Sequence, residues 1–187
     1  MRCSVFIATS ADGFIARKDG NVDWLQNSGK QDVDMGADAD MGFHAFMDSV
    51  DCLVMGRNTM EMIAAMDLTD DQWPYGETKI FVLSQSLQQL PHNMKARAEL
   101  VSGDIPSLMA HCESLGLKHA YIDGGKTIQS FLALGLISHM TITQVPVLLG
   151  QGIPLFAGLK QEIKLANPNV TVFPNDYVQL CYELGRA

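Results

Sequence analysis

The sequence predicts one α/β domain with three layers, αβα, around a mostly parallel mixed sheet that ends in an antiparallel hairpin. Short β-branched and aromatic segments alternate with helical patterns along most of the chain, which is typical of parallel strands joined by right-handed crossovers. The last strand-like segments have no helix between them, which favours a hairpin. The chain has 187 residues, the size of a single domain, and 1–187 contains no linker or repeat.

The strand-like segments are rich in Val, Ile, Tyr and Phe. They lie at 3–9, 52–55, 79–83, 98–101, 119–122, 140–148, 170–173 and 177–184. The helical candidates are 38–49, with Asp38 as N-cap, then 57–66, 104–115 and 126–135. Residues 10–37 are rich in Gly and Asp and have little periodicity. They are expected to form a long loop, and such loops are usually functional or mobile.

Composition limits the classes of partner. The chain is 47% apolar and 18% charged, as expected of a globular protein, and its net charge of −8 argues against nucleic acid or an anionic membrane as the main partner. The N-terminus shows no signal-peptide pattern, and no apolar run approaches the ~20 residues that span a bilayer. The four cysteines form no C-x-x-C pair, so we expect buried free thiols, no metal site and a cytoplasmic protein.

The stretch YIDGGKTIQSFLALGL, residues 121–136, has the pattern of a phosphate-binding turn: a strand, two glycines and a helix. It is not a Walker A loop, because the first glycine of that motif would fall at position 120, which is Ala120. It is not a G-x-G-x-x-G fingerprint either, since 124–129 reads GGKTIQ. A nucleotide-hydrolysing enzyme is therefore disfavoured. An anion site at the helix N-terminus and an unoccupied tight turn both remain open.

A second turn of the same kind, DCLVMGRNTMEMI at 51–63, favours the anion site. Its helix opens with Arg57, a position where a positive charge opposes the helix dipole unless an anion is bound. A third strand end is followed by Ser84. Ligands of parallel sheets bind at the carboxyl ends of the strands, so the three ends predict one ligand-binding edge.

Together these motifs resemble the dihydrofolate reductase superfamily, and within it the C-terminal reductase domain of the riboflavin-pathway deaminase-reductase. The likeness covers nearly the whole chain. It is carried by SADGFIA, VMGRNT, VLS at 82–84, IDGGKTI, and GLISHMTITQVPVLLGQGIPLF at 135–156. The zinc deaminase domain of those proteins has no counterpart, since there is no H-x-E followed by P-C-x-x-C.

The resemblance implies NADPH as cofactor, with Arg57 near its 2′-phosphate. The residues implied as cofactor contacts are Ala8, Asp12, Gly13, Ile15, Gly56, Arg57, Thr59, Ser84, Gly124, Gly125, Lys126, Thr127 and Ile128. Trp24, Phe43 and Thr143 are the candidate substrate contacts. For Trp24 the alternative is a buried anchor of the loop, and for Thr143 an ordinary strand position.

Two departures from the resembled families concern the substrate. Dihydrofolate reductases use a carboxylate on the first helix, and Asp40 is the best candidate here, with a capping or solvated residue as the alternative. After VMGRNT the chain lacks both the ADDP-like stretch and the basic residues that hold a ribose phosphate, so the phosphoribosylaminouracil substrate is in doubt.

The sequence thus predicts an NADPH-dependent reductase that transfers hydride to a small pteridine- or pyrimidine-like heterocycle. The alternative is a non-catalytic NADPH-binding module of the same fold. The resemblance also implies a homodimer. For the apolar segment 140–148, an interface and plain core both remain open.

Overall fold

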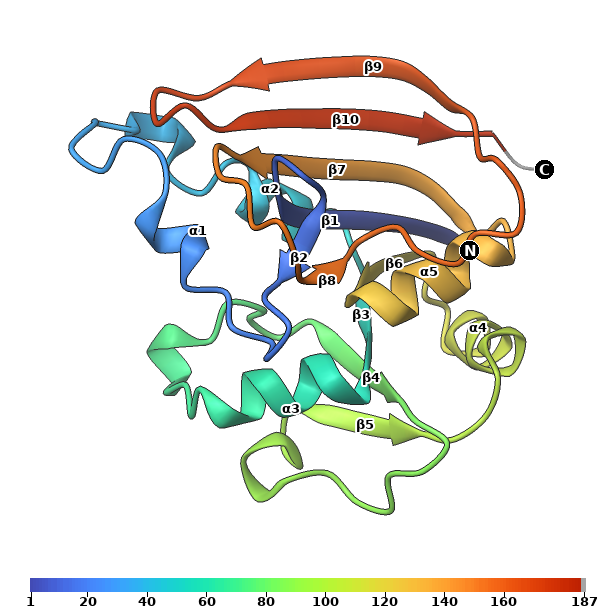
Figure 1. Cartoon of the computed structure of the whole chain (residues 1–187). Helices are drawn as coiled ribbons and strands as arrows, with labels where there is room; N and C mark the ends of the chain where they lie inside the picture. The colour runs from blue at the N-terminus through green and yellow to red at the C-terminus, as the bar shows by residue number, and fades with distance from the viewer. Residues whose placement is uncertain (186–187) are drawn as a thin grey trace.

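The computed structural model describes residues 1–185, and a single mixed sheet dominates it (Figure 1). The strand order is β5-β4-β3-β6-β1-β7-β10-β9. The strands are β1 (Arg2–Ser10), β3 (Cys52–Gly56), β4 (Lys79–Leu83), β5 (Ala98–Val101), β6 (His119–Asp123), β7 (Ile137–Val145), β9 (Leu165–Val172) and β10 (Val178–Leu184). The first six are parallel to one another, and β10 runs antiparallel to both β7 and β9.

Helices cover both faces of this sheet. They are α2 (Phe43–Asp48), α3 (Arg57–Ala65), α4 (Ile105–Ser114) and α5 (Gly125–Ala133), with short turns η1 (Gly36–Asp38), η2 (Asp70–Gln72) and η3 (His92–Met94). One buried cluster joins α4 and α5 to the face that carries Val5, Val54 and Ile122. The other joins α2 and α3 to the opposite face, which carries Leu53 and Tyr121. The predicted three-layer αβα fold with a hairpin end is therefore confirmed.

The connections create a crevice at the carboxyl end of β6. After β6 the chain passes into α5 on one face, whereas after both of its neighbours, β3 and β1, it passes to α3 and α2 on the other face. Such a reversal is a topological switch point, where the loops diverge and leave room for a ligand. The motif at 121–136 therefore lies at the position in this sheet that is best suited to bind one.

The segment 10–37 is more ordered than expected. It contains β2 (Phe14–Ala16), which pairs with β8 (Ile153–Pro154), and the short helix α1 (Trp24–Asn27). The predicted helix 38–49 is wrong in its first half. Met41 and Gly42 have positive φ angles of 52° and 82°, which interrupt the helix, so α2 begins only at Phe43.

Two late strands also differ from their predicted bounds. The strand predicted at 140–148 is β7, residues 137–145, and it lies between β1 and β10 inside the sheet, so it is core and offers no free edge for a partner. The strand predicted at 170–173 is β9, which begins at Leu165. The sequence analysis missed its first residues because Asn167 and Pro168 interrupt the pattern of strand-forming residues. The four cysteines are free thiols, three buried and Cys181 half-buried. Within residues 1–185, no helix has the length and apolar character needed to cross a membrane.

Candidate functional site at the carboxyl edge of the sheet

The two glycine corners that follow β3 and β6 interlock. A Cβ atom at Gly56 would lie 2.7 Å from the Oγ1 atom of Thr127, and a Cβ atom at Gly124 would overlap the Oγ1 atom of Thr59. Thr59 is the third residue of α3 and Thr127 the third residue of α5, so each helix covers the glycine of the other corner. The two helix N-termini are therefore held side by side on one rim, as the motifs predicted.

The N-terminus of α5 offers unpaired donors at this rim. Gly124 precedes the helix with a φ of 89° and provides no side-chain cap. The N–H groups of Gly125, Lys126 and Thr127 have no acceptor among residues 1–185, because they precede the first intrahelical hydrogen bond. Ile128, implied as a cofactor contact, has a side chain that is fully buried in the core, and its N–H donates to the Gly124 carbonyl at 2.9 Å.

The β3 corner carries a cation that is already paired. Arg57 donates from Nε to Oε1 of Glu61, one turn later in α3, at 2.6 Å. The register pairs Gly56 with Leu83, so Arg57 and Ser84 leave adjacent strands side by side. Ser84 is buried, and its hydroxyl accepts the N–H of Leu87 at 3.1 Å, which stabilises the turn after β4.

Asp12 anchors the first loop through its carboxylate. It accepts the Ser10 hydroxyl at 2.6 Å and the N–H groups of Leu149 and Gly150 at 3.1 and 2.7 Å. These hydrogen bonds, that of Ser10 first, hold the pKa of Asp12 below its ordinary value. The carboxylate of Asp12, implied as a cofactor contact, is thus committed to hydrogen bonds within its own chain, where it ties the loop at 10–13 to the loop after β7.

The rest of the first loop lies against the glycine corner. The Gly13 carbonyl accepts the N–H of Leu155 at 3.0 Å. Ile15 packs on Gly125: a Cβ atom added at Gly125 would lie 2.8 Å from the Cδ1 atom of Ile15. Ala8 is half-buried on β1, next to the cluster around Trp24. The small sheet of β2 and β8 therefore covers the N-terminus of α5, as Figure 1 also shows.

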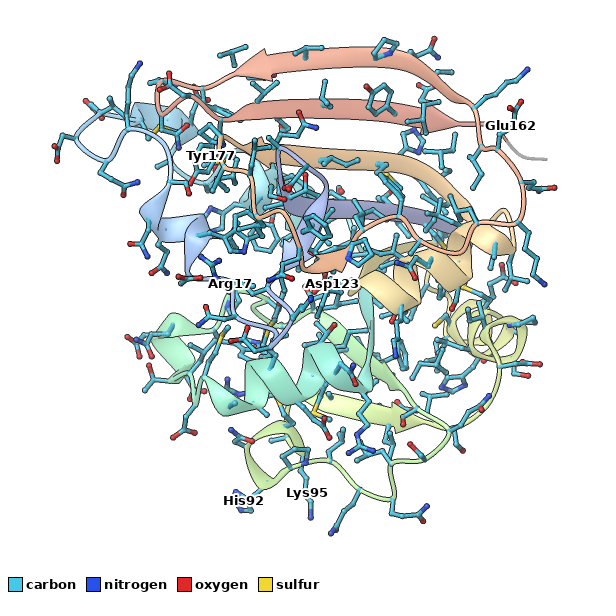
Figure 2. The ribbon with its side chains drawn as sticks, viewed as in Figure 1. Arg17, His92, Lys95, Asp123, Glu162 and Tyr177 are labelled. Atoms are coloured by element: carbon cyan, nitrogen blue, oxygen red, sulfur yellow. The ribbon has the colours of Figure 1, made fainter. Side chains whose placement is uncertain are left out.

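Asp123, the last residue of β6, is a candidate site residue that the sequence analysis did not name. It precedes the two glycines, at the switch point between β3 and β1, and Figure 2 shows it in the middle of the molecule. Burial raises the pKa of Asp123 from its ordinary 3.8 to about 6, although the N–H of Gly124 at 2.8 Å and the nearby Tyr121 hydroxyl partly stabilise its charge. The signal was available: an ionisable residue ended an otherwise apolar strand directly before the glycine turn.

Aromatic side chains form the surroundings of Asp123. Burial raises the pKa values of the Tyr75 and Tyr121 hydroxyls, and the nearby Asp123 carboxylate raises them further. The Phe43 ring meets those of Tyr75 and Phe6 edge-on, with centroid distances of 6.5 and 5.6 Å. Phe43, predicted as a substrate contact, therefore belongs to the aromatic wall that includes Tyr75, on the same side of the sheet as Asp123.

Asp40 has the geometry of a helix cap. Its carboxylate accepts the N–H groups of Gly42 and His44 at 3.0 and 2.8 Å and pairs with Nδ1 of His44 at 2.6 Å. These bonds lower the pKa of Asp40, so the side chain stays ionised at neutral pH. This geometry is the capping role that the sequence analysis gave as the alternative for Asp40.

Trp24 and Thr143 are both buried beside the first loop. Trp24 is 2% exposed and packs with Val145, Phe173 and Tyr177, which makes it an anchor of the loop. Its indole Nε1 is the one buried side-chain nitrogen or oxygen without a hydrogen-bond partner among residues 1–185. The Thr143 hydroxyl accepts a hydrogen bond from Nε2 of Gln179 at 3.0 Å and is therefore paired within the protein.

A cavity of about 330 Å³ lies elsewhere, between the C-terminal part of α5 and the segment before β9. Its lining includes Leu132, Ile137, Ile163 and Leu184. Its lining includes no helix N-terminus and no acid whose pKa is raised by burial. The carboxyl edge has both, at α5 and at the half-buried Asp123, and we therefore place the candidate site there.

Similar known proteins match this chain over nearly its whole length. YwjB of Bacillus subtilis (strain 168), described as uncharacterized, is 28% identical over 179 residues, which cover 95% of each chain. A solved structure from Shewanella sp. PV-4, provisionally assigned to riboflavin biosynthesis, is 40% identical and superposes with a TM-score of 0.86 over the whole of both chains.

More distant solved structures share the fold alone. The chain covers 56% of the deaminase/5-amino-6-(5-phosphoribosylamino)uracil reductase of Thermotoga maritima, at 12% identity and a TM-score of 0.69. It covers 96% of Enterococcus faecalis dihydrofolate reductase, solved with NADP(H), at 13% identity and a TM-score of 0.64. In both cases 98% of this chain is matched. The family described as the RibD C-terminal domain matches residues 3–179, and the chain belongs to that family.

Proposed function

We propose that this protein is an NADPH-dependent reductase that transfers hydride to a small pteridine- or pyrimidine-like heterocycle. The observation that carries the proposal is Asp123, a carboxyl group with a pKa of about 6 at the switch point, directly before an anion-binding helix N-terminus. An acid and an anion site side by side are what the reduction of a ring by a phosphate-bearing cofactor requires.

The residues at the rim fit a dinucleotide. The three unpaired N–H groups of α5 and the Arg57 guanidinium are donors suited to its phosphates. When bound, NADPH supplies the hydride. The N–H groups of Gly125, Lys126 and Thr127 would hold the pyrophosphate of NADPH. Arg57 and Ser84 would face its adenosine end.

A second set of residues would receive the substrate. Adding hydride to a ring C=N bond leaves a negative nitrogen that needs a proton, and a neutral carboxyl group supplies one efficiently when its pKa is near the working pH. Asp123 has that property, whereas Asp40 does not. The rings of Phe43 and Tyr75 would pack against a flat heterocycle and exclude water. The stretch after Thr59 contributes no basic side chain for a ribose phosphate until Lys79, which favours an unphosphorylated substrate.

The first loop would close this site. Asp12 ties it to the loop after β7, and Ile15 lies on the glycine corner. The unpaired Nε1–H of Trp24 has a hydrogen bond to give, which a bound molecule or an ordered water would accept. Related proteins of known description support a reductase: dihydrofolate reductase with NADP(H) and the uracil reductase share this fold.

The experiment is to measure NADPH binding and NADPH oxidation separately. Oxidation would be followed at its absorbance band with a panel of dihydropterins, pterins and aminouracils, with and without a ribose phosphate. We expect binding together with turnover of at least one unphosphorylated ring. Binding without turnover on any ring would favour the non-catalytic module, and the absence of binding would refute both.

A further inference from the structure

The β3 corner of the rim, which we propose faces the adenosine end of the dinucleotide, carries an ion pair rather than a free cation. Arg57 and Glu61 are joined at 2.6 Å, and their side chains are 46% and 43% exposed. Helix stability does not explain the pair, because Arg57 opposes the dipole at the N-terminus and the basic-to-acidic order is the less favourable one. An arrangement that the helix itself disfavours, at the edge of a ligand site, points to a role in binding.

The neighbouring strand adds no compensating positive charge. Arg57 leaves β3 beside Ser84, and the residues that follow are Gln85 and Ser86. The Ser84 hydroxyl accepts the N–H groups of Ser86 and Leu87 at 3.4 and 3.1 Å, so this turn presents neutral groups. The segments 56–61 and 84–87 together therefore carry one cation and one carboxylate, with no net charge.

We propose that Glu61 determines cofactor specificity by competing with the 2′-phosphate of NADPH for Arg57. This inference rests on the proposed function. A phosphate monoester with nearly two negative charges must displace the carboxylate from Arg57 and then lie beside it, which costs repulsion. The 2′-hydroxyl of NADH has no such cost, because a carboxylate is a good acceptor for a ribose hydroxyl. Glu61 thus reduces the preference of the protein for NADPH over NADH without reversing it.

The test is to measure the dissociation constants of NADPH and NADH by calorimetry for the wild type and for Glu61→Gln. We expect the wild type to prefer NADPH by less than about tenfold, and Glu61→Gln to tighten NADPH binding by about three- to tenfold while NADH changes little. The effect must vanish in an Arg57→Ala background, since Glu61 acts through that guanidinium. Glu61→Gln preserves the shape of an exposed side chain, so folding is not at risk.

Glu162→Gln is the matched control. It removes the same charge from an exposed glutamate at the other end of the molecule, far from α3 (Figure 2). If both dinucleotides bind and Glu61→Gln leaves their ratio unchanged, or if Glu162→Gln changes it equally, the inference is wrong while the proposed function stands. If neither dinucleotide binds the wild type, the proposed function itself fails, and the inference fails with it.

Discussion

Asp123 lies in a less polar environment than Asp12 or Asp40, and its carboxyl group therefore holds its proton to a higher pH. Asp12 accepts three hydrogen bonds and Asp40 caps a helix, and in both cases these bonds lower the pKa. Asp123 accepts one backbone N–H and is otherwise surrounded by the strand and by tyrosines, so burial dominates. The sequence alone does not distinguish these three aspartates, and only their packing in the fold separates their pKa values.

We predict that Asp123→Asn stabilises the fold at high pH and damages the reaction. Since the pKa of Asp123 is raised from 3.8 to about 6 on folding, the ionised form destabilises the native state above pH 6, and this cost disappears below about pH 4. The amide can still accept the N–H of Gly124. Urea unfolding at pH 8 should show a gain of about 2 kcal/mol in the free energy of unfolding, with no gain at pH 4.

The same variant should lower turnover by about a hundredfold or more, because the proton donor is lost. The wild-type rate should fall as pH rises above the pKa of Asp123, whereas the variant's rate should not depend on that ionisation. An Asp123→Asn enzyme with wild-type turnover and an unchanged pH profile would exclude Asp123 as the acid. Asp40→Asn, which changes a helix cap, is the comparison and should leave the profile unaltered.

At the scale of elements, the two strand–glycine–helix units depend on each other. Thr59 of α3 covers Gly124, and Thr127 of α5 covers Gly56, so neither helix can start with a larger residue at its cap. The predicted pattern of strand, glycine and helix identified both units from local sequence. It could not show that each glycine is required by the threonine of the other unit, because that contact joins residues far apart in the chain.

We predict that Gly124→Ala destabilises the protein by more than about 2 kcal/mol, because its φ of 89° is strained for alanine and the new Cβ would overlap Thr59. Thr59 cannot rotate away freely, since its own Cβ atom lies only 3.3 Å from the added methyl group. Urea unfolding measures the loss. Gly150→Ala is the control: its φ is 71°, but nothing lies within 4 Å, so the cost should be about 1 kcal/mol. Equal losses in the two variants would refute the interlock.

At the scale of the whole molecule, local patterns predicted the layers well. The strands at 79–83 and 98–101 were predicted with their observed ends, because short and mostly apolar runs bounded by polar segments leave little ambiguity. The pairing of β2 with β8 and the late start of α2 were missed, since they depend on contacts with distant segments. Most of the rim was likewise predictable from its motifs, whereas the pKa of Asp123 depends on burial that no local pattern contains.

The expected homodimer now has a different candidate surface. Because β7 lies inside the sheet, only the edge strands β5 and β9 are free to pair with another chain, and all eight residues of β9 are exposed. Val170 and Val172 are 56% and 69% exposed, and in register with them β10 places Leu180 and Val178 on the same face. Long edge strands with exposed apolar residues are usually covered by a partner. We predict that a second copy of the chain covers this apolar face.

Light scattering after size exclusion should give twice the mass of the 20.5 kDa chain, and Val170→Lys with Val172→Lys should give the monomer mass. Two buried ammonium groups would each lose their hydration, so even a large apolar interface would not persist. The control adds the same charges to the opposite face of the same strand, through Asn169→Lys with Thr171→Lys, and should remain dimeric. Dissociation by both pairs would show that the strand edge, and not its apolar face, makes the contact. A wild type of monomer mass at micromolar concentration would rule out this dimer. The candidate site at the carboxyl ends of β3 and β6 would then have to function within one chain.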